Sequence, residues 1–535
     1  MPDREELLGI YHKSFAFLSP AVLNHVLAAC QSSLEQREMP QILSDLSHEQ
    51  NILPFLSDLA RIEAAVARVG SGEAVAGPIE TAGLQVNATL QLLDLSWKGL
   101  AAYFSQENSG VPEVQNCKEY LLVFRHPVSA GVVVRPALSE DLLLLKMLAE
   151  GRTPEEIAGL GSLPVDAVYA AMERAGDAGF LLLESSCIRR EPRSSGEEGL
   201  PFRRFLQSSF ITLQWHVTQS CDLHCKHCYD RSDRSAMRLE DGIRVLDDFR
   251  DFCRERQVRG QISFSGGNPL LYPRFAELYR AAAERGFVTA ILGNPATKGQ
   301  IEELIRIQMP SFFQVSLEGL EVHNDNVRGR GHFERIIAFL SILRELGVYS
   351  MVMLTLTEDN IDQVIPLAEF LRNRTDTFNF NRLAMVGEGS NLRLPGKDRY
   401  ADFLKEYLKA AEGNPVIGIK DNLFNILHQQ QGAEYFGGCT GFGCGAAFNF
   451  FSVLPDGEAH ACRKFPSLIG NVLKQGIADV YDSDAASRYR EGCSACSACS
   501  VRPVCGGCLA VSYGHGLDVF AEKDPYCFIQ TIDGH

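Results

Sequence analysis

The sequence lacks any apolar stretch of the roughly 18 to 20 residues that a membrane-spanning helix needs. Its first residues, MPDREELLGIYHKSF, also lack the basic and then apolar order of a secretory signal. We therefore expect a cytoplasmic chain without a membrane segment. Basic residues are outnumbered, with 51 Lys and Arg against 67 Asp and Glu and a formal charge of −16, which argues against a nucleic-acid partner.

Although only two Trp are present, 45% of the 535 residues are hydrophobic, which is enough for about three globular domains. Helical periodicity predicts a helical accessory domain over 1–110. Two strand-like runs, EYLLVFRH and GVVVRPA, then precede three helical segments, which indicates a winged-helix-like module over 115–190. The charged segment 191–204, rich in Gly, Ser and Pro, reads as a linker.

Strand-like and helical runs alternate six times over 205–395. Such β-then-α repeats predict an α/β fold with a parallel sheet, either doubly wound or curved into a partial (β/α)6 barrel. Ligands of these folds gather at the carboxyl ends of the strands. Residues 396–435 are expected to form a helical bridge, and from 436 to 535 cysteine-rich loops take over.

The sixteen cysteines are unevenly distributed: four are scattered, three lie at 221–228 and nine lie between 439 and 527. In a reducing compartment such crowding indicates metal ligation before disulfides. Cys221, Cys225 and Cys228, in CDLHCKHCY, directly follow the first predicted barrel strand. Three thiolates hold three irons of a [4Fe–4S] cluster and leave the fourth iron open to a chelating ligand. The alternatives are an incomplete zinc site or a chance spacing.

CDLHCKHCY resembles the CxxxCxxC signature of radical S-adenosylmethionine (radical SAM) enzymes, and the predicted barrel agrees with that family. The resemblance implies that Cys221, Cys225 and Cys228 hold the catalytic cluster and that S-adenosylmethionine binds beside it. It also implies further contacts to the cofactor from Tyr229, which follows the cysteine motif, and from four later segments: SGGNP, LGNPAT, VSLEG and HNDNVRG. The residues expected to make contact in these segments are, in that order, Gly266, Gly267, Asn268 and Pro269; Asn294; Ser316 and Glu318; and Arg328. Most family members have an acid where this chain has Asn268, and a salt bridge at the surface is the alternative role for Arg328.

The carboxyl-terminal cysteines resemble the SPASM extension of radical enzymes that modify peptides. That resemblance implies two auxiliary [4Fe–4S] clusters, so three clusters in all. When the order of the motifs in that extension is carried over to this sequence, it implies one ligand set of Cys439, Cys444, Cys462 and Cys508 and a second set of Cys496, Cys499, Cys505 and Cys527. CGGC is one glycine shorter than the usual CGGGC, so Cys493 is an alternative to Cys508. A pair of zinc knuckles could use the same thiolates.

Residues 119–186 resemble the PqqD-like element with which peptide maturases bind a leader peptide. In that element the leader is added as an extra strand. These resemblances imply an enzyme that modifies a ribosomally synthesised precursor peptide through a 5′-deoxyadenosyl radical, with electrons from a flavodoxin- or ferredoxin-type reductant. A thioether between a cysteine sulfur and carbon is the expected product, and the subgroup associated with thio(seleno)oxazole-type precursors is the one that the resemblance suggests.

Several alternatives stay open at this point. A related maturase could form carbon–carbon crosslinks or epimerise its peptide. A sulfatase-maturase-like enzyme would form formylglycine, although that group generally has no fused leader-binding module. A nonenzymatic metal-binding regulator would use the winged helix on DNA, although few basic residues occur on its last predicted helix.

Overall fold

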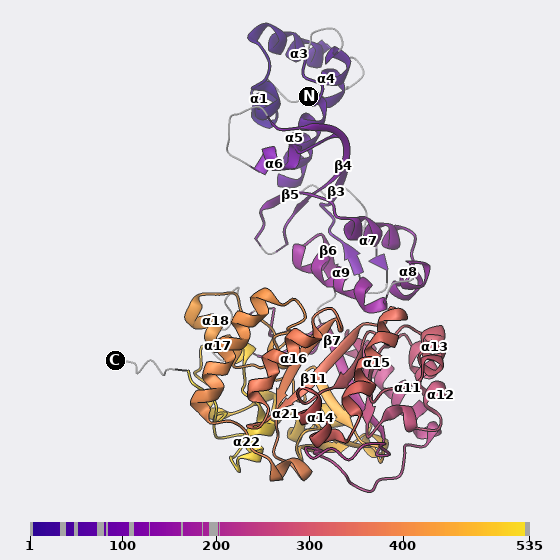
Figure 1. The fold of residues 1–535 in the computed structure, drawn as a ribbon. Coiled ribbons are helices and arrows are strands. Elements are labelled where there is room, and N and C mark those ends of the chain that lie inside the picture. The colour runs from indigo at the N-terminus through magenta and orange to yellow at the C-terminus, as the bar shows by residue number, and fades with distance from the viewer. Residues whose placement is uncertain are drawn as a thin grey trace. The chain divides into compact units, whose positions relative to one another are not determined.

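The computed structural model describes residues 4–32, 39–47, 52–71, 80–81, 84–105, 112–127, 129–161, 164–183, 186–191, 202 and 204–529. Most of the predicted linker, 191–204, lies outside these residues. The chain forms two compact units, Met1–Glu184 and Ser185–His535 (Figure 1). Within the described residues, no helix is long and apolar enough to cross a membrane.

The first unit begins with helices, as the periodicity predicts. They are α1 (Arg4–Ile10), α2 (His12–Phe15), α3 (Pro20–Ser32), α4 (Met39–Ser47), α5 (Leu56–Gly70) and α6 (Leu100–Ser105). Helix alone is too simple a description of residues 1–110, however, because three strands interrupt it: β1 (Glu80–Thr81), β2 (Leu84–Val86) and β3 (Gln91–Lys98). Buried and exposed residues alternate along most of β3, which is the period of a strand with one face covered.

The elements expected over 115–190 are present as β4 (Gln115–Arg125), β5 (Val132–Pro136), α7 (Ser139–Ala149), α8 (Pro154–Gly161), α9 (Val165–Ala178) and β6 (Leu181–Leu183). The first turn of α8 has a capping box, in which Thr153 and Glu156 exchange backbone-to-side-chain hydrogen bonds of 3.0 and 3.3 Å. β3, β4 and β5 form one antiparallel sheet. The predicted boundary near residue 110 therefore falls between two paired strands.

Both faces of β4 in this sheet carry buried side chains. Leu121 and Val123 of β4 pack with the buried residues of α1–α6. Leu122 and Phe124 alternate with them and are also fully buried, and Phe124 contacts the ring of Phe180 after α9. Since successive side chains of a strand point to opposite faces, one face of the sheet covers the amino-terminal helices and the other lies toward the following helices.

The second unit contains the predicted partial barrel. Its strands are β7 (Phe210–Thr218), β8 (Arg259–Gly266), β9 (Val288–Leu292), β10 (Phe313–Ser316), β11 (Ser350–Leu356) and β12 (Thr377–Arg382), all parallel and adjacent in chain order. A doubly wound sheet would reverse its order at a switch point. The uninterrupted order therefore confirms the partial barrel and rejects the doubly wound alternative.

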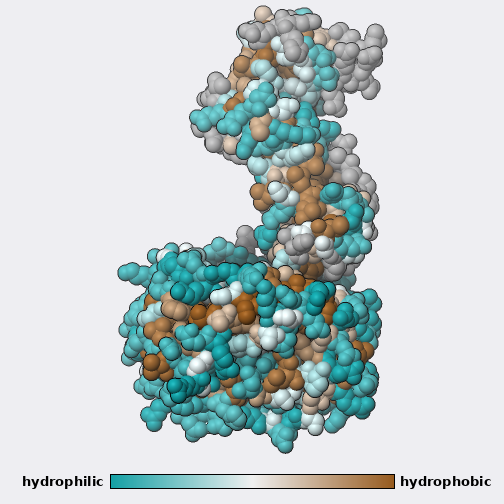
Figure 2. Space-filling view, turned by 45° about the vertical axis from the view of Figure 1, so that its right-hand side comes forward, coloured by the Kyte–Doolittle hydropathy of each residue, from teal (hydrophilic) through white to brown (hydrophobic). Residues whose placement is uncertain are grey.

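Amphipathic helices connect these strands and cover the outside of the sheet (Figure 1). They are α11 (Leu239–Glu255), α12 (Phe275–Glu284), α13 (Lys298–Ile307), α14 (Glu321–Arg328), α15 (His332–Glu345) and α16 (Val364–Leu371). Phe249 and Phe252 of α11 are buried against the barrel core, which also contains Trp215 and Phe264. Hydrophilic residues cover much of the face of this unit turned toward the viewer in Figure 2.

Helices α17 (Lys397–Gly413) and α18 (Phe424–Gln431) lie in the segment 396–435, where a helical bridge is expected. Beyond residue 435 the chain is more regular than predicted. β13 (Phe450–Val453) pairs in parallel with β7, and β14 (Glu458–His460) and β15 (Leu468–Asn471) extend the same sheet to nine strands. Helices α19 (Val472–Gln475), α20 (Ile477–Asp482), α21 (Asp484–Glu491) and α22 (Leu509–Gly514) follow. The carboxyl-terminal segment is thus anchored to the barrel by backbone pairing as well as by its cysteine-rich loops.

Candidate active site

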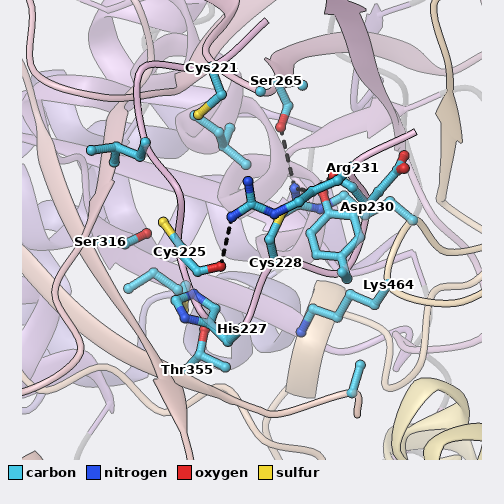
Figure 3. Close-up of a pocket in the computed structure, with 18 of the residues that line it drawn as sticks. Cys221, Cys225, His227, Cys228, Asp230, Arg231, Ser265, Ser316, Thr355 and Lys464 are labelled. Carbon is cyan, nitrogen blue, oxygen red and sulfur yellow. Dashed lines mark hydrogen bonds between the residues drawn. The ribbon is translucent and has the colours of Figure 1, made fainter. Parts of the chain in front are cut away.

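A cavity of about 480 Å³ lies at the carboxyl ends of the barrel strands, and the loop after β7 brings Cys221, Cys225 and Cys228 to its wall (Figure 3). Most of the other predicted cofactor residues line the same cavity: Tyr229, Gly266, Gly267, Asn294, Ser316 and Arg328. Asn268, Pro269 and Glu318 are not among its lining residues. Residues at the ends of four strands, β7, β8, β9 and β10, and of helix α14 are thus brought together around the three thiols.

Two N–H groups approach the sulfur atoms of the loop. Arg328 Nη1 lies 3.6 Å from Cys225 Sγ, and Asn294 Nδ2 lies 3.7 Å from Cys221 Sγ. Burial raises the pKa of all three thiols, so thiolates need a positive partner here. Iron supplies that positive charge, and N–H donors to sulfur favour the thiolate form. The donor set therefore fits the three-thiolate cluster that the sequence predicts.

The glycine pair after β8 allows close backbone contact with the three-cysteine loop. Gly266 has φ = +131°, and a Cβ atom on Gly267 would lie 2.3 Å from the carbonyl oxygen of Ser220. Gly267 N donates to Thr218 O at 2.9 Å, and Asn268 N donates to Ser220 O at 2.8 Å. The turn thus holds the chain immediately before Cys221 in place, so it is more than a connection between elements.

We predict that Gly267→Ala displaces the three-cysteine loop, because the new methyl group overlaps backbone atoms. Overpacking of this kind costs about 1–3 kcal/mol, so binding of S-adenosylmethionine should weaken by about tenfold or more. Equilibrium dialysis with the labelled cofactor measures this. Gly299→Ala in α13 is the matched control, because no atom lies within 4 Å of its added Cβ. Equal binding by both variants would contradict the assigned role of the turn.

The side chain of Asn268 donates a hydrogen bond to Asp222, a residue that the sequence analysis did not identify. Its Nδ2 donates to Asp222 Oδ1 at 3.1 Å, and its Oδ1 accepts from Leu270 N at 3.3 Å. Asp222 Oδ1 also accepts from Asn294 Nδ2 at 2.6 Å. The carboxylate that the family resemblance implies for the glycine turn is absent here, and the Asn268 amide instead bonds to a carboxylate next to Cys221. The position of Asp222 inside the cysteine motif was the signal that could have indicated this role.

Glu318 and Arg328 form an ion pair of 2.5 Å. Because this pair is buried, the alternative prediction of a salt bridge at the surface for Arg328 is wrong. Thr355 N donates to Glu318 Oε2 at 2.7 Å. Burial alone would raise the pKa of the Glu318 carboxyl group, but His227 and Arg328 hold that pKa below its ordinary value. Glu318 therefore fixes the guanidinium of Arg328 beside Cys225 instead of lining the cavity itself.

Arg463, a second residue that the motifs did not reveal, connects the carboxyl-terminal segment to the barrel. Its Nη1 donates to Tyr229 Oη at 2.5 Å and to Ser265 Oγ at 3.3 Å. Burial raises the pKa of Tyr229 to about 12, so the phenol stays protonated. Because Arg463 directly follows Cys462, the site around Tyr229 is coupled to the next group of cysteines.

That group surrounds a second cavity of about 350 Å³, which we call the auxiliary cavity. Four cysteines line it, namely Cys439, Cys444, Cys462 and Cys508. It shares wall residues with the first cavity, including Gln314, Arg382, Arg463 and Lys464. This is the first auxiliary ligand set predicted from the sequence, with Cys508 and without Cys493, and four thiols fit a fully ligated [4Fe–4S] cluster.

The second predicted set also lies together. Cys496, Cys499, Cys505 and Cys527 line a small space of about 20 Å³. Cys493 lies with Cys444 and Cys496 along a separate cleft. No group of three or more His, Cys, Asp or Glu side chains in the described residues is arranged to hold one metal ion. A [4Fe–4S] cluster distributes its thiolates over four irons, so this finding concerns single ions.

Known proteins resemble this chain in the same two regions. Residues 215–371 match the Radical SAM superfamily, and residues 444–508 match SPASM, an iron–sulfur cluster-binding domain. The AdoMet-dependent heme synthase of Methanosarcina barkeri is 26% identical, covering 59% of this chain and 95% of that protein. The mycofactocin maturase MftC of Mycolicibacterium smegmatis is 28% identical, covering 59% of this chain and 82% of that protein.

Among solved structures, Streptococcus suis SuiB is similar in fold, with a TM-score of 0.50 and 17% identity over 77% of this chain and 96% of SuiB. The strand order, the three-cysteine loop and the two cysteine groups agree with these matches. The chain is therefore an enzyme with a radical SAM domain and a SPASM domain, and its cofactors are S-adenosylmethionine and [4Fe–4S] clusters.

Proposed function

We propose that this enzyme modifies a ribosomally synthesised precursor peptide by joining a cysteine sulfur to a carbon atom as a thioether. The observation that carries the proposal is the adjacency of the two cavities. The cavity of the three-cysteine loop and the auxiliary cavity share Gln314, Arg382, Arg463 and Lys464. A substrate at this shared wall would be within reach of both cysteine groups.

Cys221, Cys225 and Cys228 would hold the first cluster, which together with S-adenosylmethionine supplies a 5′-deoxyadenosyl radical. Arg328, held by Glu318, and Asn294 would donate N–H groups to the bound thiolates. The backbone of Gly266 and Gly267 and the side chains of Tyr229 and Ser316 would border the cofactor. The barrel wall would keep water from the reacting carbon, which limits side reactions of a radical.

The two auxiliary ligand sets supply eight thiolates, so neither auxiliary cluster needs an open iron for substrate. We therefore assign these clusters to electron transfer. Thioether formation removes one electron and one proton when a thiol adds to a carbon radical, and a cluster beside the substrate can accept the electron. A flavodoxin- or ferredoxin-type protein would deliver electrons from outside.

Residues 119–186 would bind the leader of the precursor. Among the described strands, β5 pairs with β4 alone, and an edge strand is where an extended peptide is added. α9 would provide the adjoining helical contact. A structure of SuiB bound to its precursor peptide SuiA has the same similarity to this chain, with a TM-score of 0.50 and 77% of this chain covered. That precedent supports a peptide as the substrate.

A tetrapyrrole is the second candidate substrate, because a heme synthase is among the relatives. That match accounts for 59% of this chain, whereas the SuiB fold accounts for 77%. The part of the chain beyond the heme synthase match favours the peptide, since a small substrate needs no separate unit for delivery.

The test uses the full-length protein reconstituted with iron and sulfide, S-adenosylmethionine and a reductant. The probes are synthetic cysteine-containing peptides encoded by short reading frames beside its gene, with iron coproporphyrin as the competing probe. We expect one peptide to lose two hydrogens and one alkylatable thiol. Loss of two hydrogens with all thiols retained would mean a carbon–carbon crosslink, an unchanged mass with altered chirality would mean epimerisation, and turnover of the porphyrin alone would overturn the proposal.

A further inference from the structure

Lys420 is an unusual residue of the auxiliary cavity. It lies in the segment between α17 and α18 and lines the cavity together with Cys439 and Cys462. Its side chain is partly buried, and this burial lowers the pKa of its ammonium group. No hydrogen bond or ion pair joins the ammonium to any of the described residues. Withdrawing an ammonium from water without an anionic partner is unfavourable, so a negative charge in the cavity would stabilise it.

The neighbouring carboxylates do not supply that charge. Asp421, the next residue, binds Arg382 Nε at 2.7 Å, and Asp524 binds the other side of the same guanidinium. The charged groups that act on Lys420 are the thiols of Cys439 and Cys462, which favour its charged form, and the cations Lys464 and Arg463, which oppose it. The available anions are therefore the cysteine ligands of the first auxiliary set.

A bound cluster with four thiolates is negatively charged overall, and reduction adds one further negative charge. A fixed cation beside it stabilises the reduced state more than the oxidised state, because the Coulomb attraction grows with the charge of the cluster. The attraction is stronger for partly buried charges than for exposed ones, because solvent screens partly buried charges less. Net charge and hydrogen bonds to sulfur are among the factors that set cluster potentials.

We propose that Lys420 is a positioning residue that raises the reduction potential of the cluster held by Cys439, Cys444, Cys462 and Cys508. The inference rests on the proposed function, which places a cluster there. In the step that it serves, a peptide thiol adds to a substrate carbon radical, the S–H bond breaks and the C–S bond forms. The proton would leave to solvent, and a cluster held by these four cysteines would take up the one electron released. Lys420 makes this cluster the better electron acceptor.

The experiment is an EPR-monitored redox titration of the full chain with dithionite. Alanines at Cys221, Cys225 and Cys228 remove the first cluster, so that about eight irons and two auxiliary signals remain. Lys420→Gln should lower one of the two potentials so that the ratio of reduced to oxidised cluster at a fixed potential falls by about tenfold, equivalent to about 59 mV for one electron. Lys420→Arg, which keeps the charge, should restore most of the potential.

Lys405→Gln is the matched control, because this lysine is exposed on α17 and pairs with Asp402. We expect it to leave both potentials unchanged. Lys420→Met serves as a second neutral variant if Lys420→Gln loses iron. If a neutral variant retains about eight irons and its two potentials are unchanged, the inference about Lys420 is overturned, whereas the assignment of the auxiliary clusters stands. A parent protein with about four irons or fewer would overturn the assignment of the auxiliary clusters, and the inference with it.

Discussion

Replacing Cys225 with alanine is expected to abolish cleavage of S-adenosylmethionine to 5′-deoxyadenosine and to remove about four irons per chain. Each thiolate of a three-cysteine site holds one iron, so two thiolates cannot retain the cluster. Cys225 is also the thiol that faces Arg328 Nη1 at 3.6 Å, so its loss leaves the buried Glu318–Arg328 pair without its sulfur partner. Chromatography of the nucleoside and iron analysis measure the two effects independently.

The matched control is Cys117→Ala, since Cys117 is an exposed thiol of the first unit. This variant should keep about twelve irons, the sum of three clusters, and full 5′-deoxyadenosine release. Release of 5′-deoxyadenosine by Cys225→Ala at the parent rate would reject the three-cysteine loop as the catalytic site. An equal loss in both variants would indicate that cysteine substitution damages the protein in general.

The barrel could be predicted from the sequence because its signals are local. Each strand of β7–β12 is a short apolar run followed by an amphipathic helix, and short right-handed connections leave few ways to order such strands. Once β7 is recognised as the first barrel strand, the sequence alone places the three thiols on the loop at its carboxyl end. β3 was missed because its alternation, in QLLDLSW, is short and lies between helices. Only its pairing with β4 distinguishes it from a helical segment.

The contacts within the site could not be predicted in the same way. Arg463 reaches Tyr229 across 234 positions of the sequence, and this contact depends on β13 pairing with β7. Which of Cys508 and Cys493 lines the auxiliary cavity likewise depends on how the CGGC turn packs, and it is Cys508 that does so. Asn268 is the converse case. Its place in the motif predicts a contact with the cofactor, but in the structure its amide donates a hydrogen bond to Asp222. Motif order identifies the residues of a site, and packing decides which atom each side chain faces.

The same dependence on packing gives the second large expected effect, at Arg382. This residue ends β12 and is 1% exposed. Its guanidinium binds Asp421 at 2.7 Å and both carboxylate oxygens of Asp524 at 2.7 and 2.9 Å. Asp524 in turn accepts from the backbone N–H of Cys508 at 2.8 Å. Burial alone would raise the pKa of Asp524, but Arg382 holds that pKa below its ordinary value. One guanidinium thus connects the barrel, through Asp524, to Cys508 of the auxiliary cavity.

Arg382→Met leaves two buried carboxylates without a cation, and breaking a buried pair in this way costs about 3–5 kcal/mol. We expect the free energy of unfolding of the second unit to fall by that amount. Urea unfolding of the full chain, followed by Trp215 fluorescence in a Trp97→Phe background, measures it, because these are the two Trp residues of the sequence. Arg399→Met, which breaks an exposed pair with Asp362, should cost less than about 1 kcal/mol. Similar losses in the two variants would mean that the Arg382 network does not stabilise the junction between the barrel and the cysteine-rich segment.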